Sequence, residues 1–195
     1  MRRAMTRLDE ATERELVRLA RRGDTAAFDQ LVVHHQRVVF NIAYRMTGNR
    51  QEAEDVAQET FVKAYQALDR FDPQRPFAPW LYRIATNTAL NWIKRRRPEM
   101  ELSEGVPLTD PAAPGPEAQA IAADTSARLR AAIATLPPNY RAAIELRHFQ
   151  GLSYQEMSES LGVPLSDVKS WLFRARRRLR KMLAPDAAEV VQPTR

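Results

Sequence analysis

Apolar residues along this chain recur at the three- and four-residue spacing of amphipathic helices, and the alternation typical of β-strands is not sustained anywhere. The periodicity predicts an N-terminal block with helices near 11–22, 25–47, 50–69 and 78–97. It predicts a C-terminal block with helices near 124–136, 138–149, 153–161 and 165–184. The predicted fold class is therefore all-α, with two small helical bundles.

Turn residues and helix caps mark the ends of these elements. Four glycines each follow a helix-like stretch, which is the usual place of a helix C-cap: Gly23, Gly48, Gly151 and Gly162. Ser153 and Glu156 have the spacing of a capping box, which predicts a helix start at this point. Asp24 is placed to cap the helix that begins at 25.

A proline-rich, acidic segment separates the two blocks. Five of the thirteen prolines fall within 98–116, and no Lys or Arg occurs between 98 and 127. This composition is typical of an extended linker. We therefore predict a first domain over 11–97, a flexible linker over 98–123, a second domain over 124–184 and a tail over 185–195.

The composition also excludes several kinds of site. The chain has no cysteine, so disulfides, thiolate metal sites and cysteine nucleophiles are excluded. Two of its three histidines, His34 and His35, are adjacent and point to different sides of a helix, so we predict no metal site and no cofactor. The longest apolar stretches are far shorter than the roughly 20 residues that span a bilayer, and no apolar segment follows the basic N-terminus. We expect a cytoplasmic protein without membrane insertion.

Positive charge is concentrated in two places on a chain whose net charge is +6. Residues 165–183 contain seven Lys or Arg and one acid, Asp167, and residues 94–97 are four consecutive bases. Clusters of this kind are typical of proteins that bind polyanions. A solvated helix face is the alternative explanation for any single basic run.

Residues 153–180 have the spacing of a helix-turn-helix, with a short helix, a turn that contains Gly162 and a longer second helix. One face of the second helix is apolar and is predicted to pack on the rest of the block: Val168, Trp171, Leu172, Ala175, Leu179 and Met182. The other face carries hydroxyls, an aromatic ring and bases: Ser166, Ser170, Phe173, Arg174, Arg177 and Lys181. Such a face is suited to base edges and phosphates in a major groove. The alternative is a partly buried Phe173 beside solvent-facing arginines.

A second candidate nucleic-acid surface lies on the predicted helix 78–97. One side of this helix is mainly small and apolar: Leu81, Ala85, Thr88, Ala89 and Trp92. The other side combines an aromatic ring with amides and bases: Trp80, Arg83, Asn87, Asn91 and Lys94. Aromatic rings stack on unpaired bases with roughly 1–3 kcal/mol per base, so this side is suited to opened strands. Burial in the core is the alternative for Trp80.

The predicted helix 50–69 has a mainly acidic outer stripe on an otherwise basic protein. The stripe contains Glu52, Asp55, Gln58, Glu59, Val62 and Gln66. Because it would repel DNA, it is either a solubility surface or a docking surface for a basic protein. The spacing does not choose between these two roles.

Taken together, these segments resemble a known family. They are AEDVAQETFVKAY (53–65), PWLYRIATNTALNW (79–92) and LPPNYRAAIELRHFQGLSYQEMSESLGVPLSDVKSWLFRARRRLR (136–180). In this order they are similar to the bacterial extracytoplasmic-function (ECF) sigma factors of RNA polymerase, and the resemblance covers about residues 12–184. The chain departs from the family pattern at Pro79, at Ser166-Asp167 and at Trp171, which leaves the promoter sequence open.

The resemblance implies a transcription initiation factor that binds core RNA polymerase and promoter DNA. Its second domain would also meet the flap of the second-largest polymerase subunit. The coiled coil of the largest subunit would dock on Asp55, Gln58, Glu59 and Val62. The −10 element would be melted and captured by Trp80, Asn87 and Asn91, with Arg83 and Lys94 on the same face. The −35 element would be read by Lys169, Ser170, Phe173 and Arg174, beside Ser166 and Arg177.

The resemblance also implies a linker that threads toward the polymerase active-site cleft, and an anti-sigma factor as a further partner. The main rival class is an ordinary helix-turn-helix repressor or activator, which predicts a dimer on an inverted repeat and leaves the Trp80–Asn91 face without a role. An enzyme acting on nucleic acid is not supported, because the chain has no Walker loop, no nucleophile elbow and no metal-site carboxylate pattern. We therefore expect neither catalytic residues nor an obligate homo-oligomer.

Overall fold

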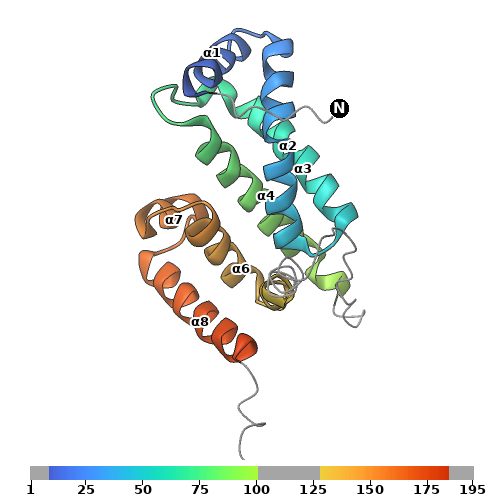
Figure 1. The fold of residues 1–195 in the computed structure, drawn as a ribbon, viewed down its shortest axis with the longest axis vertical. Helices are drawn as coiled ribbons and strands as arrows, with labels where there is room; N and C mark the ends of the chain where they lie inside the picture. Colours follow the sequence, from blue (N-terminus) through green and yellow to red (C-terminus); the bar gives the residue numbers. More distant parts are fainter. Residues whose placement is uncertain (1–8, 101–127, 185–195) are drawn as a thin grey trace, which may run out of the picture.

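The computed structural model describes residues 9–100 and 128–184, and in these ranges the regular elements are all helical (Figure 1). The predicted all-α class is therefore confirmed. The predicted tail and most of the predicted linker lie outside the described residues. The first three linker positions do not: helix α4 continues through them to Met100, although Pro98 lacks the backbone N–H that a helix interior uses.

The first three helices are α1 (Glu10–Ala20), α2 (Thr25–Thr47) and α3 (Arg50–Ala67). Each begins beside a residue whose side-chain oxygen accepts a hydrogen bond from the backbone N–H three residues later, at 2.8–3.1 Å: Asp9, Asp24 and Asn49. Such caps satisfy amides that have no partner within the helix. The predicted cap at Asp24 is thus confirmed. Helix α2 ends at Gly48, whose φ of 75° lies in the left-handed region that favours glycine.

The short 3-10 helix η1 (Leu68–Arg70) and helix α4 (Phe77–Met100) complete the N-terminal block. The predicted apolar side of α4 is confirmed, since Leu81, Ala85, Thr88 and Ala89 are buried and Trp92 is half-buried. His35 of α2 is buried between Glu13 of α1, 2.9 Å from its Nε2, and Tyr82 of α4, 3.1 Å from its Nδ1. A buried ring that bonds to both neighbours fixes α1 and α4 against α2.

The C-terminal block contains residues 128–134, which are helical, and then α6 (Pro138–Ile144), η2 (Glu145–Phe149), α7 (Tyr154–Leu161) and α8 (Leu165–Leu183). Element η2 is a π-helical turn that continues α6. It is closed by a hydrogen bond of 3.1 Å from the Gln150 N–H to the Glu145 carbonyl oxygen. Such turns insert an extra residue into a helix and are frequent at functional sites.

Helices α7 and α8 form the predicted helix-turn-helix. The capping box of Ser153 and Glu156 is present in both directions, and α7 ends at Gly162, whose φ is 64°. Val168, Leu172 and Ala175 of α8 are buried, and Trp171 and Leu179 are half-buried, as the pattern predicts. The prediction is wrong for Met182, which is exposed because the core of the block ends before this last turn.

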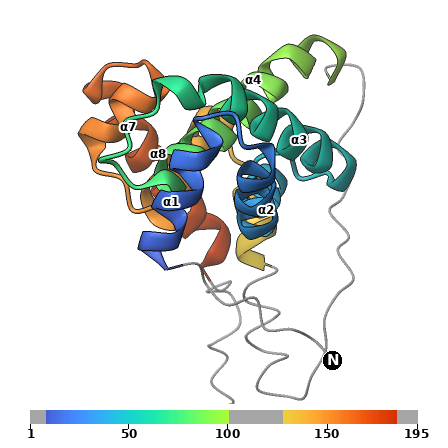
Figure 2. The same cartoon turned by 90° about the horizontal axis from the view of Figure 1, so that it is seen from above.

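The two blocks pack against each other, which the sequence pattern did not indicate. Ala142 of α6 and Leu161 of α7 join one apolar cluster with Met46 of α2 and Ala89 of α4. Helices α6 and α7 both contact α4, and Figure 1 shows them beside it. Figure 2 shows the same arrangement from above. The buried Arg141 side chain donates hydrogen bonds to backbone carbonyls of both blocks, and burial lowers its pKa to about 10, so it stays charged at neutral pH.

Candidate nucleic-acid and partner interfaces

The outer face of α8 is free to meet a ligand. Ser166, Lys169, Phe173, Arg174 and Arg177 are exposed, and Ser170 is half-buried. The Phe173 ring is 68% exposed, so the alternative that it belongs to the core is wrong. A helix that packs on its block by one face and presents an exposed aromatic ring among bases on the other has the form of a recognition helix.

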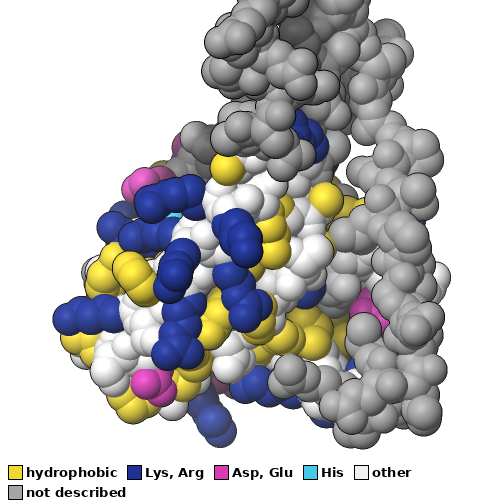
Figure 3. Space-filling model, turned by 90° about the horizontal axis from the view of Figure 1, so that it is seen from below, with side chains coloured by type: hydrophobic (Ala, Val, Ile, Leu, Met, Phe, Trp, Pro, Cys, Tyr) yellow, Lys and Arg dark blue, Asp and Glu magenta, His cyan; other side chains and the backbone are white. Residues whose placement is uncertain are grey.

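Tyr140 of α6 lies beneath the basic side of α8. Its hydroxyl oxygen is 3.5 Å from Nη1 of Arg174, an interaction that raises the pKa of that guanidinium, and its ring lies 5.6 Å from the guanidinium carbon of Arg178. Tyr140 therefore helps to position both arginine side chains on the surface of α8. Viewed from the α8 end of the molecule, Lys and Arg side chains gather over this face, with few acidic side chains among them (Figure 3). The surface is suited to a polyanion.

The candidate face of α4 is partly engaged within the protein. The half-buried Trp80 ring packs against Phe71 and Phe77, with ring centroids 4.8 and 5.5 Å apart. Trp80 thus belongs to the edge of the core and still keeps an accessible part. Arg83 is half-buried, whereas Asn91 and Lys94 are exposed.

Asn87, in the middle of this face, contacts the other block. Its side-chain Nδ2 donates a hydrogen bond of 2.7 Å to the backbone carbonyl oxygen of Ser160, near the end of α7. The neighbouring Thr86 is buried, and its hydroxyl lies 2.9 Å from Nε2 of Gln150. The five predicted residues therefore share one side of α4, but the C-terminal block covers its centre.

The predicted acidic stripe of α3 divides into two surfaces. Glu59 pairs with Lys63 at 2.6 Å and with Arg95 of α4 at 3.3 Å, and Glu52 pairs with Arg96 at 2.6 Å. The hydrogen bond from Lys63 is the main cause of the lowered pKa of Glu59. These carboxylates face the basic end of α4. A single acidic stripe that faces solvent is thus the wrong description of this helix, because Glu52 and Glu59, about two turns apart, pair with bases on the adjacent helix.

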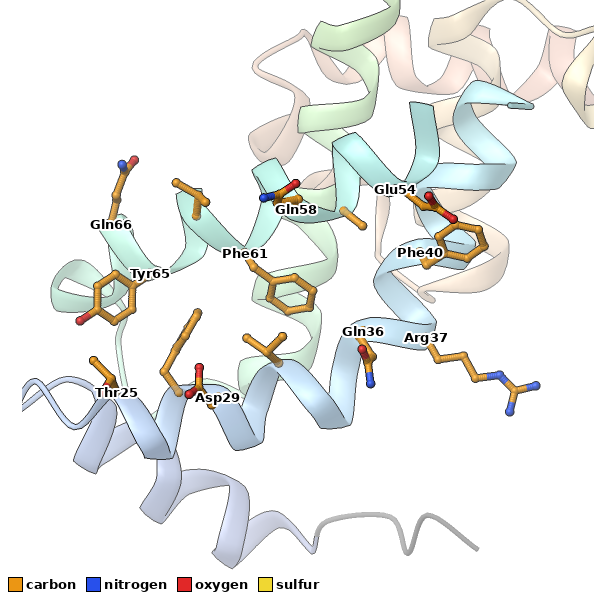
Figure 4. Close-up of a pocket in the computed structure, with 14 residues that line it drawn as sticks. Thr25, Asp29, Gln36, Arg37, Phe40, Glu54, Gln58, Phe61, Tyr65 and Gln66 are labelled. Atoms are coloured by element: carbon orange, nitrogen blue, oxygen red, sulfur yellow. The ribbon is translucent and has the colours of Figure 1, made fainter. Parts of the chain in front are cut away.

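Gln58 and Val62, by contrast, line an apolar groove between α2 and α3 (Figure 4). The groove has a volume of about 880 Å³, and its apolar walls are Phe28, Val32, Phe40, Ala57, Phe61, Val62 and Tyr65. Asp29, Arg37 and Glu54 supply charges at its edges. The α2 wall was missed in the sequence analysis. The signal for it was a second row on α2 at multiples of four residues, Phe28, Val32 and Phe40, interrupted by Gln36, beside the row that faces the core.

The comparisons with known proteins decide the family. Residues 31–99 match the family model of sigma-70 region 2, and residues 126–179 match that of sigma-70 region 4. The ECF RNA polymerase sigma factor SigE of Mycolicibacterium smegmatis is 40% identical, over 87% of this chain and 68% of that protein. The RNA polymerase sigma-H factor of Pseudomonas aeruginosa is 38% identical, over 91% of this chain and 97% of the relative. The chain belongs to the ECF sigma factors.

The solved structure of CnrH in complex with the cytosolic domain of CnrY is similar to this sigma factor, with 30% identity, a TM-score of 0.61 and coverage of 90% of this chain and 99% of that one. The predicted class of function is thereby confirmed: the protein is a promoter-recognising transcription initiation factor. In the described ranges, no helix is long and apolar enough to cross a membrane, and no group of side chains could hold a metal ion.

Proposed function

We propose that this sigma factor divides promoter recognition between its two blocks. Helix α8 reads the paired −35 element through Lys169, Ser170, Phe173 and Arg174, with Ser166 and Arg177 beside them. The α4 face of Trp80, Arg83, Asn87, Asn91 and Lys94 captures the opened −10 strand. The observation that carries this division is the contrast between the faces: α8 presents an exposed basic surface, and α4 presents a ring and amides next to a core edge.

The groove between α2 and α3 is the proposed dock for the coiled coil of the largest polymerase subunit. Its apolar floor and charged edges fit an amphipathic helix, which lays its apolar side into such a groove. Val62 is 50% exposed at the edge of the groove, so it offers apolar area that a partner can bury. Gln58 lines the same groove. We assign Asp55 and Glu59 to the surface beside the groove, where Glu59 pairs with Arg95 and both would meet the remainder of the same coiled coil.

Further partners follow from the family. The C-terminal block would contact the flap of the second-largest subunit, and an anti-sigma factor would hold the protein inactive. Support for the second partner comes from a similar structure, that of the sigma factor RpoE with the anti-sigma factor NepR from Bartonella quintana (26% identity, TM-score 0.61). On this proposal the protein acts in the cytoplasm, as a monomer, through binding and without catalysis of its own.

Run-off transcription from a library of random promoters, with purified core polymerase, tests the proposal. We expect the transcribed templates to share two separate elements at a fixed spacing. A protein that yields no transcript with core polymerase, yet binds one palindromic duplex as a dimer, would instead belong to the rival class of helix-turn-helix repressors.

Binding of variants to purified core polymerase tests the role of the groove separately. Val62→Asp should weaken binding to core polymerase by at least about tenfold, since it places a charge in an apolar contact. Val33→Asp is the matched control, because Val33 is 56% exposed on α2 outside the groove. Equal binding by the two variants would remove the groove from the proposal.

A further inference from the structure

Besides the Arg141 hydrogen bond to the Met46 carbonyl oxygen, the two blocks share a small set of polar side-chain contacts, which we name the interdomain latch. It comprises Arg45, Thr86 and Asn87 of the N-terminal block and Glu145, Gln150 and Ser160 of the C-terminal block. Arg45 binds both carboxylate oxygens of the buried Glu145, at 2.7 and 2.9 Å, and its guanidinium carbon lies 4.3 Å from the centroid of the Phe149 ring. Most of the C-terminal partners lie in or next to the π-helical turn η2.

The interdomain latch engages the side chain of Asn87, which belongs to the α4 face proposed to capture the −10 strand. The Asn87 amide donates to the Ser160 carbonyl oxygen, an acceptor of the same kind as the oxygen and nitrogen acceptors on a base edge. A base cannot receive that hydrogen bond while α7 holds it. The closed arrangement and a captured strand therefore compete for this N–H of Asn87 and for the side of α4 that α7 covers.

The region between the two blocks also contains buried polar atoms without hydrogen-bond partners. Among the described residues, the buried side-chain polar atoms without a hydrogen-bond partner are Trp92 Nε1, Arg141 Nε, Gln150 Oε1 and Ser160 Oγ. Arg141, Gln150 and Ser160 make contacts between the blocks, and Trp92 packs on the apolar cluster that the blocks share. A buried polar atom without a partner lowers the stability of the arrangement that buries it. The same atoms would be free to bind water once the blocks separate.

We propose that the interdomain latch is an autoinhibitory contact: in the free protein it holds the blocks together and withdraws Asn87 from single-stranded DNA. Opening frees the α4 face, and by linkage a bound strand favours the open form. The apparent affinity for a strand is reduced by the fraction of molecules that are open, so weakening the latch raises it. The masking step rests on the proposed role of the α4 face, whereas the closed state of the blocks does not.

The experiment uses the full chain and two readouts. Because the chain has no cysteine, Gln51→Cys and Gln155→Cys provide unique labelling sites at exposed positions, one on each block, for energy transfer between dyes. The second readout is the affinity for a labelled single strand of 12 mixed-sequence nucleotides. The variants are Arg45→Glu, which repels Glu145, the charge swap Arg45→Glu/Glu145→Arg, and the control Arg14→Glu. Arg14 pairs with the exposed Glu10 and lies on α1, outside the latch.

We expect Arg45→Glu to lower energy transfer and to bind the strand at least about threefold more tightly, although it removes a positive charge that DNA would favour. The charge swap should restore both values, and Arg14→Glu should change neither upward. Unchanged energy transfer in Arg45→Glu would overturn the latch. Lower energy transfer without tighter binding would overturn the masking. Adding Asn87→Ala to Arg45→Glu separates the proposals: if the gain in binding persists, Asn87 is not the masked group, and its assignment to the −10 face fails independently of the measured opening.

Discussion

Arg45 and Glu145, which are 100 residues apart in the sequence, form a two-pronged ion pair in which the carboxylate is only 2% exposed. The geometry joins helix α2 of the N-terminal block to the π-helical turn η2 of the C-terminal block. The pair is therefore both a structural contact and the centre of the interdomain latch.

This pair predicts a specific loss of stability. Arg45→Ala leaves Glu145 buried without a counter-charge, which should lower the free energy of unfolding by about 3 kcal/mol. Arg50→Ala removes an exposed partner of Glu54 and should cost about 0.5 kcal/mol or less. Urea unfolding of the two variants measures the difference, and equal losses would mean that the Arg45 pair contributes no more than a surface pair.

The basic side chains of α8 should fall into two groups, those that read bases and those that contact only phosphates. Lys169→Ala or Arg174→Ala is expected to cost about 1–3 kcal/mol at one position of the −35 element and to relax the base preference there. Arg180→Ala, exposed farther along α8, should weaken all duplexes alike and reduce the salt slope of binding by about one. Binding to −35 variants and to random duplex at several salt concentrations provides the measurement. An equal loss of specific and random binding in all three variants would contradict the assignment.

Substitutions on the apolar side of α8 should lower the stability of the C-terminal block in the middle of the helix but not at its C-terminal end. Leu172 is 1% exposed, and its replacement by Ala should cost about 2–5 kcal/mol of unfolding free energy, from lost burial and the cavity left behind. Met182→Ala should cost less than about 1 kcal/mol, because that side chain is largely in solvent. Thermal or urea unfolding compares the two, and a similar cost at both positions would show that the last turn of α8 belongs to the core.

The stability of the C-terminal block should depend on pH in part through His148. Burial, and then the charges of Arg176 and Arg147, lower the pKa of this ring from 6.5, so folding favours its neutral form. The stability it contributes is fully present above pH 6.5 and is lost as the pH falls through the lowered pKa. An NMR titration should place the midpoint below 6.5, and His148→Gln should flatten the fall in stability between neutral pH and that midpoint. A midpoint above 6.5 would reverse the sign of the contribution.

The local elements could be predicted because their signals are local. The caps at Asp24 and Ser153, the left-handed glycines and the apolar side of α4 each depend on a few neighbouring residues. The exposed side of α8 was predictable for the same reason, since its charge is segregated within one helix.

The relationships between elements could not be predicted in this way. Glu59 was placed on a free stripe because its partner Arg95 is 36 residues away on another helix. The contact of Asn87 with Ser160 joins residues 73 positions apart, and no periodicity within either helix indicates it. The groove between α2 and α3 is formed by residues of both helices. Each helix alone has the pattern of an ordinary helix with a broad apolar face, so neither pattern predicts the groove.

The most direct test of the two-element account is promoter selection repeated with single variants. Core polymerase is combined with the wild type, with Arg174→Ala and with Asn91→Ala, and the preferred templates are sequenced for each. Asn91 is chosen because it is exposed on the α4 face and lies outside the interdomain latch. We predict that Arg174→Ala alters preferences only within the −35 element and that Asn91→Ala alters them only within the −10 element. If both variants change the same element, or neither changes either one, the two faces do not read separate parts of the promoter.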